Sequence, residues 1–157
     1  MNLKKESIAT TIISFILLTI LIVSVSYFFV TSKLLIGPIL ILLGIFSLLP
    51  LILLKTPAQI LRSELLFGII DNGILAIFAL SGAELFGLLG AIVGSVVGNA
   101  ITDGLAGIFE GYEWQKITRS KIKEKRTILT IALGKLSGCL LGAGAVLTLY
   151  WTILNLF

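Results

Sequence analysis

Two aspartates lie inside apolar runs that are long enough to cross a lipid bilayer. Asp71 is followed by Asn72 and Gly73, and Asp103 is followed by Gly104. An ionised side chain in hydrocarbon costs about 3 kcal/mol on insertion scales, so such a residue normally faces a partner or a water-filled cavity. Both aspartates therefore predict a functional polar site within the membrane.

Other polar side chains extend this predicted site. Asn99 and Glu110 lie four residues before and seven residues after Asp103, so the three share one helical face. Asn72 adds an amide beside Asp71, and carboxylate and amide oxygens suit hard cations such as Mg²⁺, Mn²⁺ or Ca²⁺. We predict that these five residues bind ions or carry protons, with Asp71, Asp103 and Glu110 as the metal ligands.

Lys135 is the predicted electrostatic partner of these acids. From the helix rise, Asp71, Lys135 and Asp103 are expected roughly 10, 13 and 15 Å from the cytoplasmic side. A buried ion pair that only fixes the helix register is one interpretation of Lys135. The two aspartates and Glu110 outnumber this lysine, however, and a surplus of negative charge favours a bound cation or a proton.

The composition is that of a membrane protein. The chain has 157 residues, of which 57% are hydrophobic and 13% charged. Five stretches reach the roughly 20 residues that a membrane helix needs: Ser7–Thr31, Leu34–Leu54, Leu65–Ala83, Leu85–Phe109 and Thr127–Leu154. We predict an all-α polytopic protein with one membrane domain over residues 1–157. Residues 1–56 would form two peripheral spans, and residues 57–157 three glycine-rich core spans that carry the polar site.

The basic residues predict the orientation. With five alternating spans, one side of the membrane receives Lys4, Lys5, Lys55, Arg62, Lys116, Arg119, Lys121, Lys123, Lys125 and Arg126. Such a bias places the N-terminus in the cytoplasm and indicates a multi-pass protein, which we expect in a prokaryotic cell membrane. The run Lys116–Arg126 is expected against anionic lipid headgroups, and no nucleic-acid partner is predicted. Glu64 is interpreted as part of a polar connector before the third span.

Glycines recur every fourth residue in two of the core spans. They are Gly90, Gly94 and Gly98 in one, and Gly134, Gly138 and Gly142 in the other. This spacing creates smooth helix faces where another backbone can approach closely. Packing within the chain and a homodimer built on these glycine faces are both consistent with the pattern.

Several kinds of chemistry are excluded or disfavoured by composition. The chain has no histidine, so no serine–histidine catalytic pair exists, and no enzyme activity is predicted. Met1 and Cys139 are the only methionine and cysteine. The chain therefore lacks the ligands for a soft-metal site or a cysteine cluster, and one cysteine cannot form an internal disulfide. Cys139 is interpreted as a small packing residue. No tightly bound cofactor is expected.

From Arg62 onward, roughly over residues 62–115, the chain resembles the vacuolar iron transporter family. The resemblance is carried by Arg62-Ser-Glu-Leu-Leu-Phe-Gly-Ile-Ile-Asp-Asn-Gly73 and by the small-residue-rich helix at 94–111. It implies that Asp71 matches the family's membrane aspartate in the ion path, and that a divalent cation is exchanged for protons. Asp103 stands where the family commonly has methionine, which argues against selectivity for ferrous iron. The family's acidic cytoplasmic insert is replaced here by a basic loop, and two extra spans precede the match.

Two functions follow as hypotheses. The first is membrane transport of a cation, a hard divalent metal ion of the Mg, Mn or Fe(II) class, with or without proton coupling. The second is a non-transporting membrane subunit, or scaffold, whose buried Asp and Lys groups form a structural ion pair.

Overall fold

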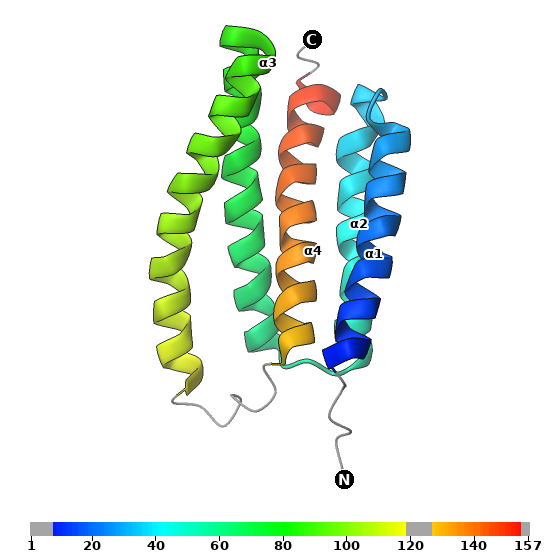
Figure 1. The fold of residues 1–157 in the computed structure, drawn as a ribbon, viewed down its shortest axis with the longest axis vertical. Helices are drawn as coiled ribbons and strands as arrows, with labels where there is room; N and C mark the ends of the chain where they lie inside the picture. The colour runs from blue at the N-terminus through cyan, green and yellow to red at the C-terminus, as the bar shows by residue number, and fades with distance from the viewer. Residues whose placement is uncertain (1–7, 119–126, 155–157) are drawn as a thin grey trace.

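The protein is a bundle of long helices. The computed structural model describes residues 8–118 and 127–154. The helices run in the order α1 (Ile8–Phe29), α2 (Lys33–Leu53), α3 (Ala58–Thr118) and α4 (Ile128–Leu147), and a π-helical segment η2 (Thr148–Ile153) continues α4 (Figure 1). The predicted all-α architecture is confirmed for these residues. Four helices are long and apolar enough to cross a membrane.

The helix α3 is a hairpin of two arms. Its 61 residues are interrupted by non-helical backbone at Phe86 (φ −137°, ψ 16°) and Gly87 (φ 61°, ψ −142°). The backbone angles at Gly87 strongly favour glycine, and the chain turns back there (Figure 1). The first arm (residues 58–85) and the second arm (residues 88–118) correspond to the third and fourth predicted spans. The start of α1 and the end of η2 lie at opposite ends of the bundle.

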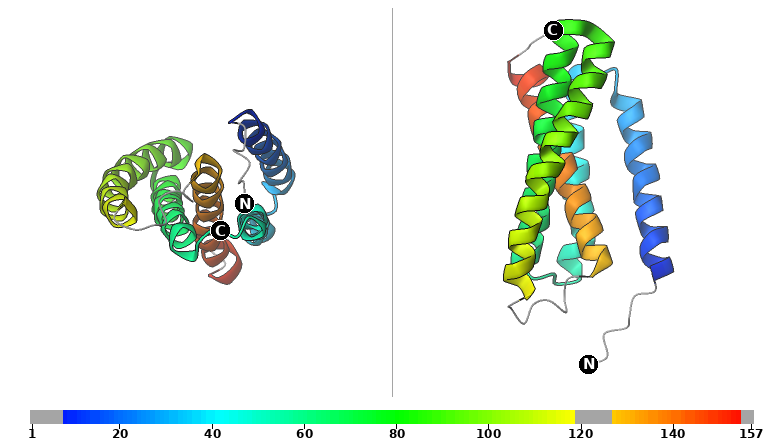
Figure 2. Two further views of the ribbon diagram at one scale, coloured as in Figure 1. Left: turned by 90° about the horizontal axis from the view of Figure 1, so that it is seen from below. Right: turned by 60° about the vertical axis from the view of Figure 1, so that its left-hand side comes forward.

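The helix α4 occupies the centre of the bundle, beside the first arm of α3 (Figures 1 and 2). A Cβ atom added at Gly138 would lie 2.5 Å from the carbonyl oxygen of Leu65, and one added at Gly68 would lie 2.5 Å from that of Lys135. The backbones therefore touch, as the glycine spacing predicts. Gly134 packs against Glu64 and Gly138 against Leu65, so the two segments run parallel.

The helix α2 covers another side of α4 just as closely. A Cβ atom at Gly37 would lie 2.5 Å from the backbone nitrogen of Thr148, and one at Gly44 would lie 3.1 Å from the carbonyl oxygen of Ser137. The Thr152 hydroxyl also donates a hydrogen bond of 2.9 Å to the carbonyl oxygen of Leu34. The expected peripheral position therefore fits α1 and not α2, because α2 carries glycines at its contact with α4.

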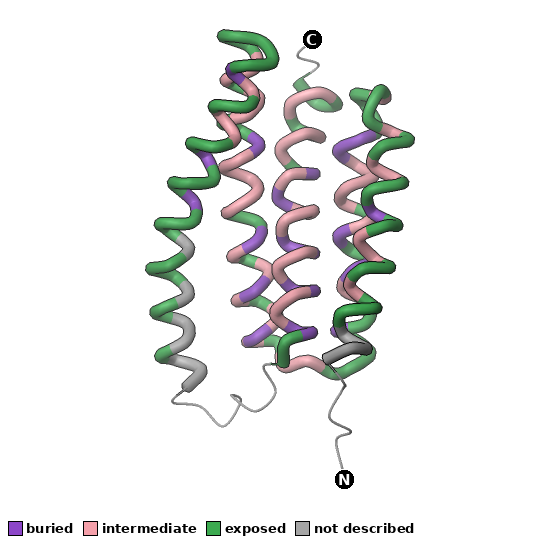
Figure 3. Tube along the Cα trace, in the orientation of Figure 1, coloured by how far each residue is buried: buried purple, intermediate pink, exposed green. Residues whose placement is uncertain are grey.

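The helix α1 lies at the edge of the bundle (Figure 2). It contains no glycine, and Ile22 is its one buried side chain among those described. Buried residues concentrate on α2, α4 and the first arm of α3 (Figure 3), while most large apolar side chains face outward. An apolar exterior of this extent suits a hydrocarbon environment.

Candidate functional site: a polar contact between α3 and α4

Asp71 lies on the first arm of α3 and is half-buried. The Asn72 amide donates a hydrogen bond of 3.3 Å to Asp71 Oδ2, whereas Asp71 Oδ1 is buried and has no hydrogen-bond partner. A buried carboxylate oxygen without a partner loses hydration that nothing replaces. Asp71 therefore keeps one acceptor position that a cation or a proton can fill.

The residues that face Asp71 and Asn72 from the neighbouring helix belong to α4. The Cys139 side chain lies close to Asn72 and within electrostatic range of Asp71 and Lys135. The Lys135 Nζ atom stands 4.0 Å from the centroid of the Phe67 ring, a cation–π geometry. Asp71, Asn72 and Lys135 are thus all neighbours of Cys139. Cys139 itself is a neighbour of the site, and its sequence position alone carried no signal of that.

Glu64 is a buried acid that the sequence analysis assigned to a polar connector. It is 2% exposed and belongs to the first arm of α3, seven residues before Asp71 and hence on the same helical face. A Cβ atom at Gly134 would lie 2.6 Å from Glu64 Cβ, so the absence of a side chain there makes room for the acid. Glu64 and Lys135 both have interaction partners in the structure. The spacing to Asp71 is the signal that could have revealed Glu64.

Asp103 lies on the second arm of α3 and is exposed. The Asn99 amide donates a hydrogen bond of 2.9 Å to Asp103 Oδ2, which confirms that these two residues share a helical face. Glu110 follows on the same helix, but its side chain lies outside the described part of the structure.

The two aspartates stand at one level but face different neighbours. Gly98 packs against Leu75 of the first arm, and one turn further along each arm brings Thr102 level with Asp71. Thr102 is 1% exposed and faces the bundle. Asp103 is the next residue, about 100° further around the helix, so its side chain points outward. Among the described side chains, the two aspartates thus lie at a similar level of the bundle but do not meet in one cavity.

Three glycines near Asp103 face open space on the second arm of α3. A Cβ atom added at Gly104, Gly107 or Gly111 would meet no atom within 4 Å. In contrast, the glycine faces predicted from the four-residue spacing are covered inside the chain, with Gly94 against Phe78 and Gly138 against Leu65. The open glycine surface thus belongs to the second arm of α3.

Among the described side chains, no three Asp, Glu, Cys or His residues gather closely enough to hold a metal ion. Asp71 and Asp103 belong to two separate carboxylate–amide pairs, each formed within its own arm of α3. The predicted ligand set of Asp71, Asp103 and Glu110 includes a side chain that is not described. A single copy therefore offers two half-sites and not one closed coordination shell.

Comparisons with known proteins gave no match: no family model, no curated protein and no solved structure matches the chain. The resemblance of residues 62–115 to the vacuolar iron transporters stays a prediction from sequence motifs.

Proposed function

We propose that the protein crosses the membrane five times, with its N-terminus in the cytoplasm, and transports a hard divalent cation of the Mg²⁺, Mn²⁺ or Fe²⁺ class in exchange for protons. The count takes the two arms of α3 as separate crossings. One observation carries the proposal: Asp71 is half-buried in an apolar helix, and its Oδ1 atom is buried without a partner. A cation or a proton supplies the missing interaction.

Each polar residue has a role in this proposal. Asp71 binds the cation or carries the proton, and the Asn72 amide orients its carboxylate by a hydrogen bond to Oδ2. Lys135 lies on the same side of the bundle, above Phe67, and balances part of the negative charge when no cation is bound. Asn99 and Asp103 form a second station, and Glu110 lies further along the second arm toward the basic loop.

A second copy of the chain completes the site. An ionised Asp103 facing acyl chains would cost about 3 kcal/mol, so a protein neighbour or water is expected to cover it. The open positions at Gly104, Gly107 and Gly111 let another helix approach closely. A two-fold dimer along the second arm brings the Asp103 carboxylates of both copies together, where they share a cation or a proton.

The test is uptake of Mn²⁺ into liposomes that contain the purified protein. We expect Asp71→Asn to lower uptake at least tenfold and Asp103→Asn to lower it strongly. Glu84→Gln is the matched control, because Glu84 is an exposed acid near the hairpin tip, and it should leave uptake within twofold. A correctly folded wild-type protein without flux contradicts transport, and full uptake by Asp71→Asn contradicts the role of Asp71 in it.

A non-transporting subunit is the second candidate. It is favoured by the carboxylate–amide pairs, which satisfy Asp71 Oδ2 and Asp103 Oδ2 within their own arms, as a structural role requires. In that case Asp71→Asn lowers the melting temperature and the wild-type protein carries no ion. Flux and melting measured on the same samples separate the two functions.

A further inference from the structure

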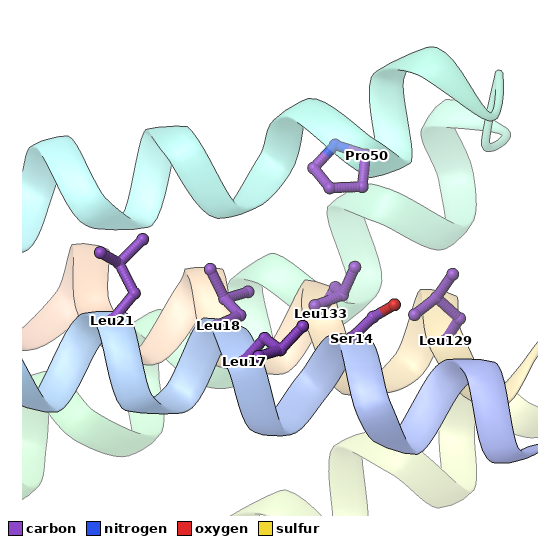
Figure 4. Close-up of a pocket in the computed structure, with 7 residues that line it drawn as sticks. All are labelled: Ser14, Leu17, Leu18, Leu21, Pro50, Leu129 and Leu133. Carbon is purple, nitrogen blue, oxygen red and sulfur yellow. The ribbon is translucent and has the colours of Figure 1, made fainter.

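An apolar groove lies between α1, α2 and α4, away from the polar residues of the candidate site (Figure 4). Its volume is about 360 Å³. The lining is Leu17, Leu18 and Leu21 from α1, Pro50 from α2, and Leu129 and Leu133 from α4, with Ser14 as its one polar member. The groove is open to the outside and not an enclosed cavity.

The groove follows from the sequence of α1. Glycines let α2 approach α4 to backbone contact, as at Gly44 beside Ser137. The helix α1 has none, and it reaches the rest of the protein through bulky side chains such as Phe15 and Leu18, which pack against Leu51, Leu129 and Leu133. Large side chains keep its backbone at a distance, and the space beside the contact stays unfilled.

We propose that one acyl chain of an anionic phospholipid occupies this groove. Water is a poor occupant, because six of the seven lining residues offer it no hydrogen bond. In a bilayer the surrounding medium is acyl chain, and a concave apolar surface contacts such a chain on several sides, whereas an ordinary helix face contacts it on one. The groove is therefore a retained lipid site.

The position of the groove identifies the headgroup. Leu129 and Leu133 come from the first turns of α4 and Pro50 from the last turn of α2, at one end of the bundle, and the α1 lining extends from there to the middle of that helix (Figures 1 and 4). Exposed Lys55 and Arg62 follow at this same end, just after α2 and in the first turns of α3. A lipid whose tail fills the groove and whose headgroup lies at this end has its phosphate at the level of these cations, with Lys55 just after α2 as the one next to a lining helix, and this favours a net negative headgroup.

Native mass spectrometry of the purified protein tests the proposal with phosphatidylglycerol and phosphatidylcholine of identical chains. We expect at least threefold more retained phosphatidylglycerol. Leu17→Trp fills the groove and should lower this retention at least fivefold. Ile20→Trp is the matched control, since Ile20 is on the same helix, similarly exposed (57% against 63%) and outside the lining, and it should stay within twofold of wild type.

Two further arms separate tail from headgroup. Lys55→Gln should reduce the preference for phosphatidylglycerol and leave phosphatidylcholine retention unchanged. Soluble glycerol phosphate should not compete, because it has no tail. Competition by glycerol phosphate would mean that a free phosphate is bound, and it would overturn the acyl-chain site.

Other outcomes also overturn the proposal. Equal retention of both lipids removes the anionic preference, and unchanged retention in Leu17→Trp removes the groove. A co-purified polypeptide or second copy that Leu17→Trp displaces, in place of lipid, assigns the groove to a protein neighbour. If Leu17→Trp does not fold, Leu21→Trp fills the other part of the groove. The comparison of the two lipids on the wild-type protein tests the anionic preference without any variant.

Discussion

The two arms of α3 contain similar motifs, yet they stand in opposite surroundings. The first arm turns its small and acidic residues toward α4, where Gly68 meets backbone and Glu64 is 2% exposed. The second arm leaves Gly104 and Gly107 open and Asp103 exposed. An aspartate beside small residues thus becomes part of the packed interior only when the chain supplies a glycine-lined neighbour. In the proposed dimer, a helix of a second copy covers the second arm.

The largest expected effect comes from filling the contact of the first arm. In Gly138→Leu the new side chain would begin 2.5 Å from the Leu65 carbonyl oxygen and 3.0 Å from Gly68 Cα. Neither backbone can give way easily, so we expect a loss of about 3 kcal/mol or more in unfolding free energy. Thermal melting in detergent measures it. Gly107→Leu, in the open surface, is the control and should not lower the melting temperature of the monomer. Equal melting temperatures of the two variants would show that the two arms are packed alike, which would contradict the comparison.

A smaller effect is expected from neutralising the buried acid. Glu64→Gln keeps the shape but disturbs the interactions of a side chain that is 2% exposed, at a cost of about 1–3 kcal/mol. Chemical denaturation followed by circular dichroism measures this cost. Glu84→Gln changes an exposed acid of the same helix and should be neutral. A neutral Glu64→Gln would show that the polar contact adds nothing to stability.

The turn between the arms is expected to respond more weakly. Gly87→Ala places a side chain at φ 61° and ψ −142°, which costs about 1–2 kcal/mol although space is open there. Gly104→Ala, in a helical and open position, should stabilise the isolated chain by about 0.5 kcal/mol. Melting temperatures should therefore move in opposite directions. A shift in the same direction would mean that the turn tolerates a side chain, or that Gly104 is already in close contact.

The smallest effect on the fold, and the sharpest test of the open arm, is cross-linking. In a Cys139→Ser background, Gly107→Cys should form disulfide-linked dimers in native membranes under mild oxidation, without a change in melting. Ser137→Cys, at a position of α4 that is 0% exposed, should give none. Dimers from neither position would leave Asp103 without the proposed neighbour and would favour a water-filled path or a different subunit.

Much of the architecture could be predicted from local sequence. Apolar runs set the helices, and the four-residue spacing of Asn99 and Asp103 gives their hydrogen bond. The turn between the arms, at Phe86 and Gly87, lies just inside the predicted fourth span and close to the predicted boundary at Glu84. These features depend on residues that are close along the chain. The seven-residue spacing places Glu64 on the helical face of Asp71, but its burial could not be predicted in this way, because it depends on Gly134, which lies beside it only through the packing of α4.

The outward direction of the Asp103 side chain could not be predicted from the sequence either. Helical periodicity identifies residues that share a face, but it does not say which neighbour covers that face. The register of the hairpin turns Thr102 inward and consequently turns Asp103 outward. The position of α2 was missed for a related reason. Gly37 and Gly44 are spaced too widely to form the four-residue pattern, yet both meet α4 directly.

The parallel course of the first arm and α4 has a consequence for biosynthesis. The first arm and α4 run in the same direction, so a segment that runs in the opposite direction, the second arm, must lie between them in the sequence. The ribosome therefore makes the second arm before α4. Until then Glu64 and Asp71 have emerged without the helix that covers them. The nascent chain therefore passes through a stage in which these two acids lack their contact with α4 and need water or another partner in its place.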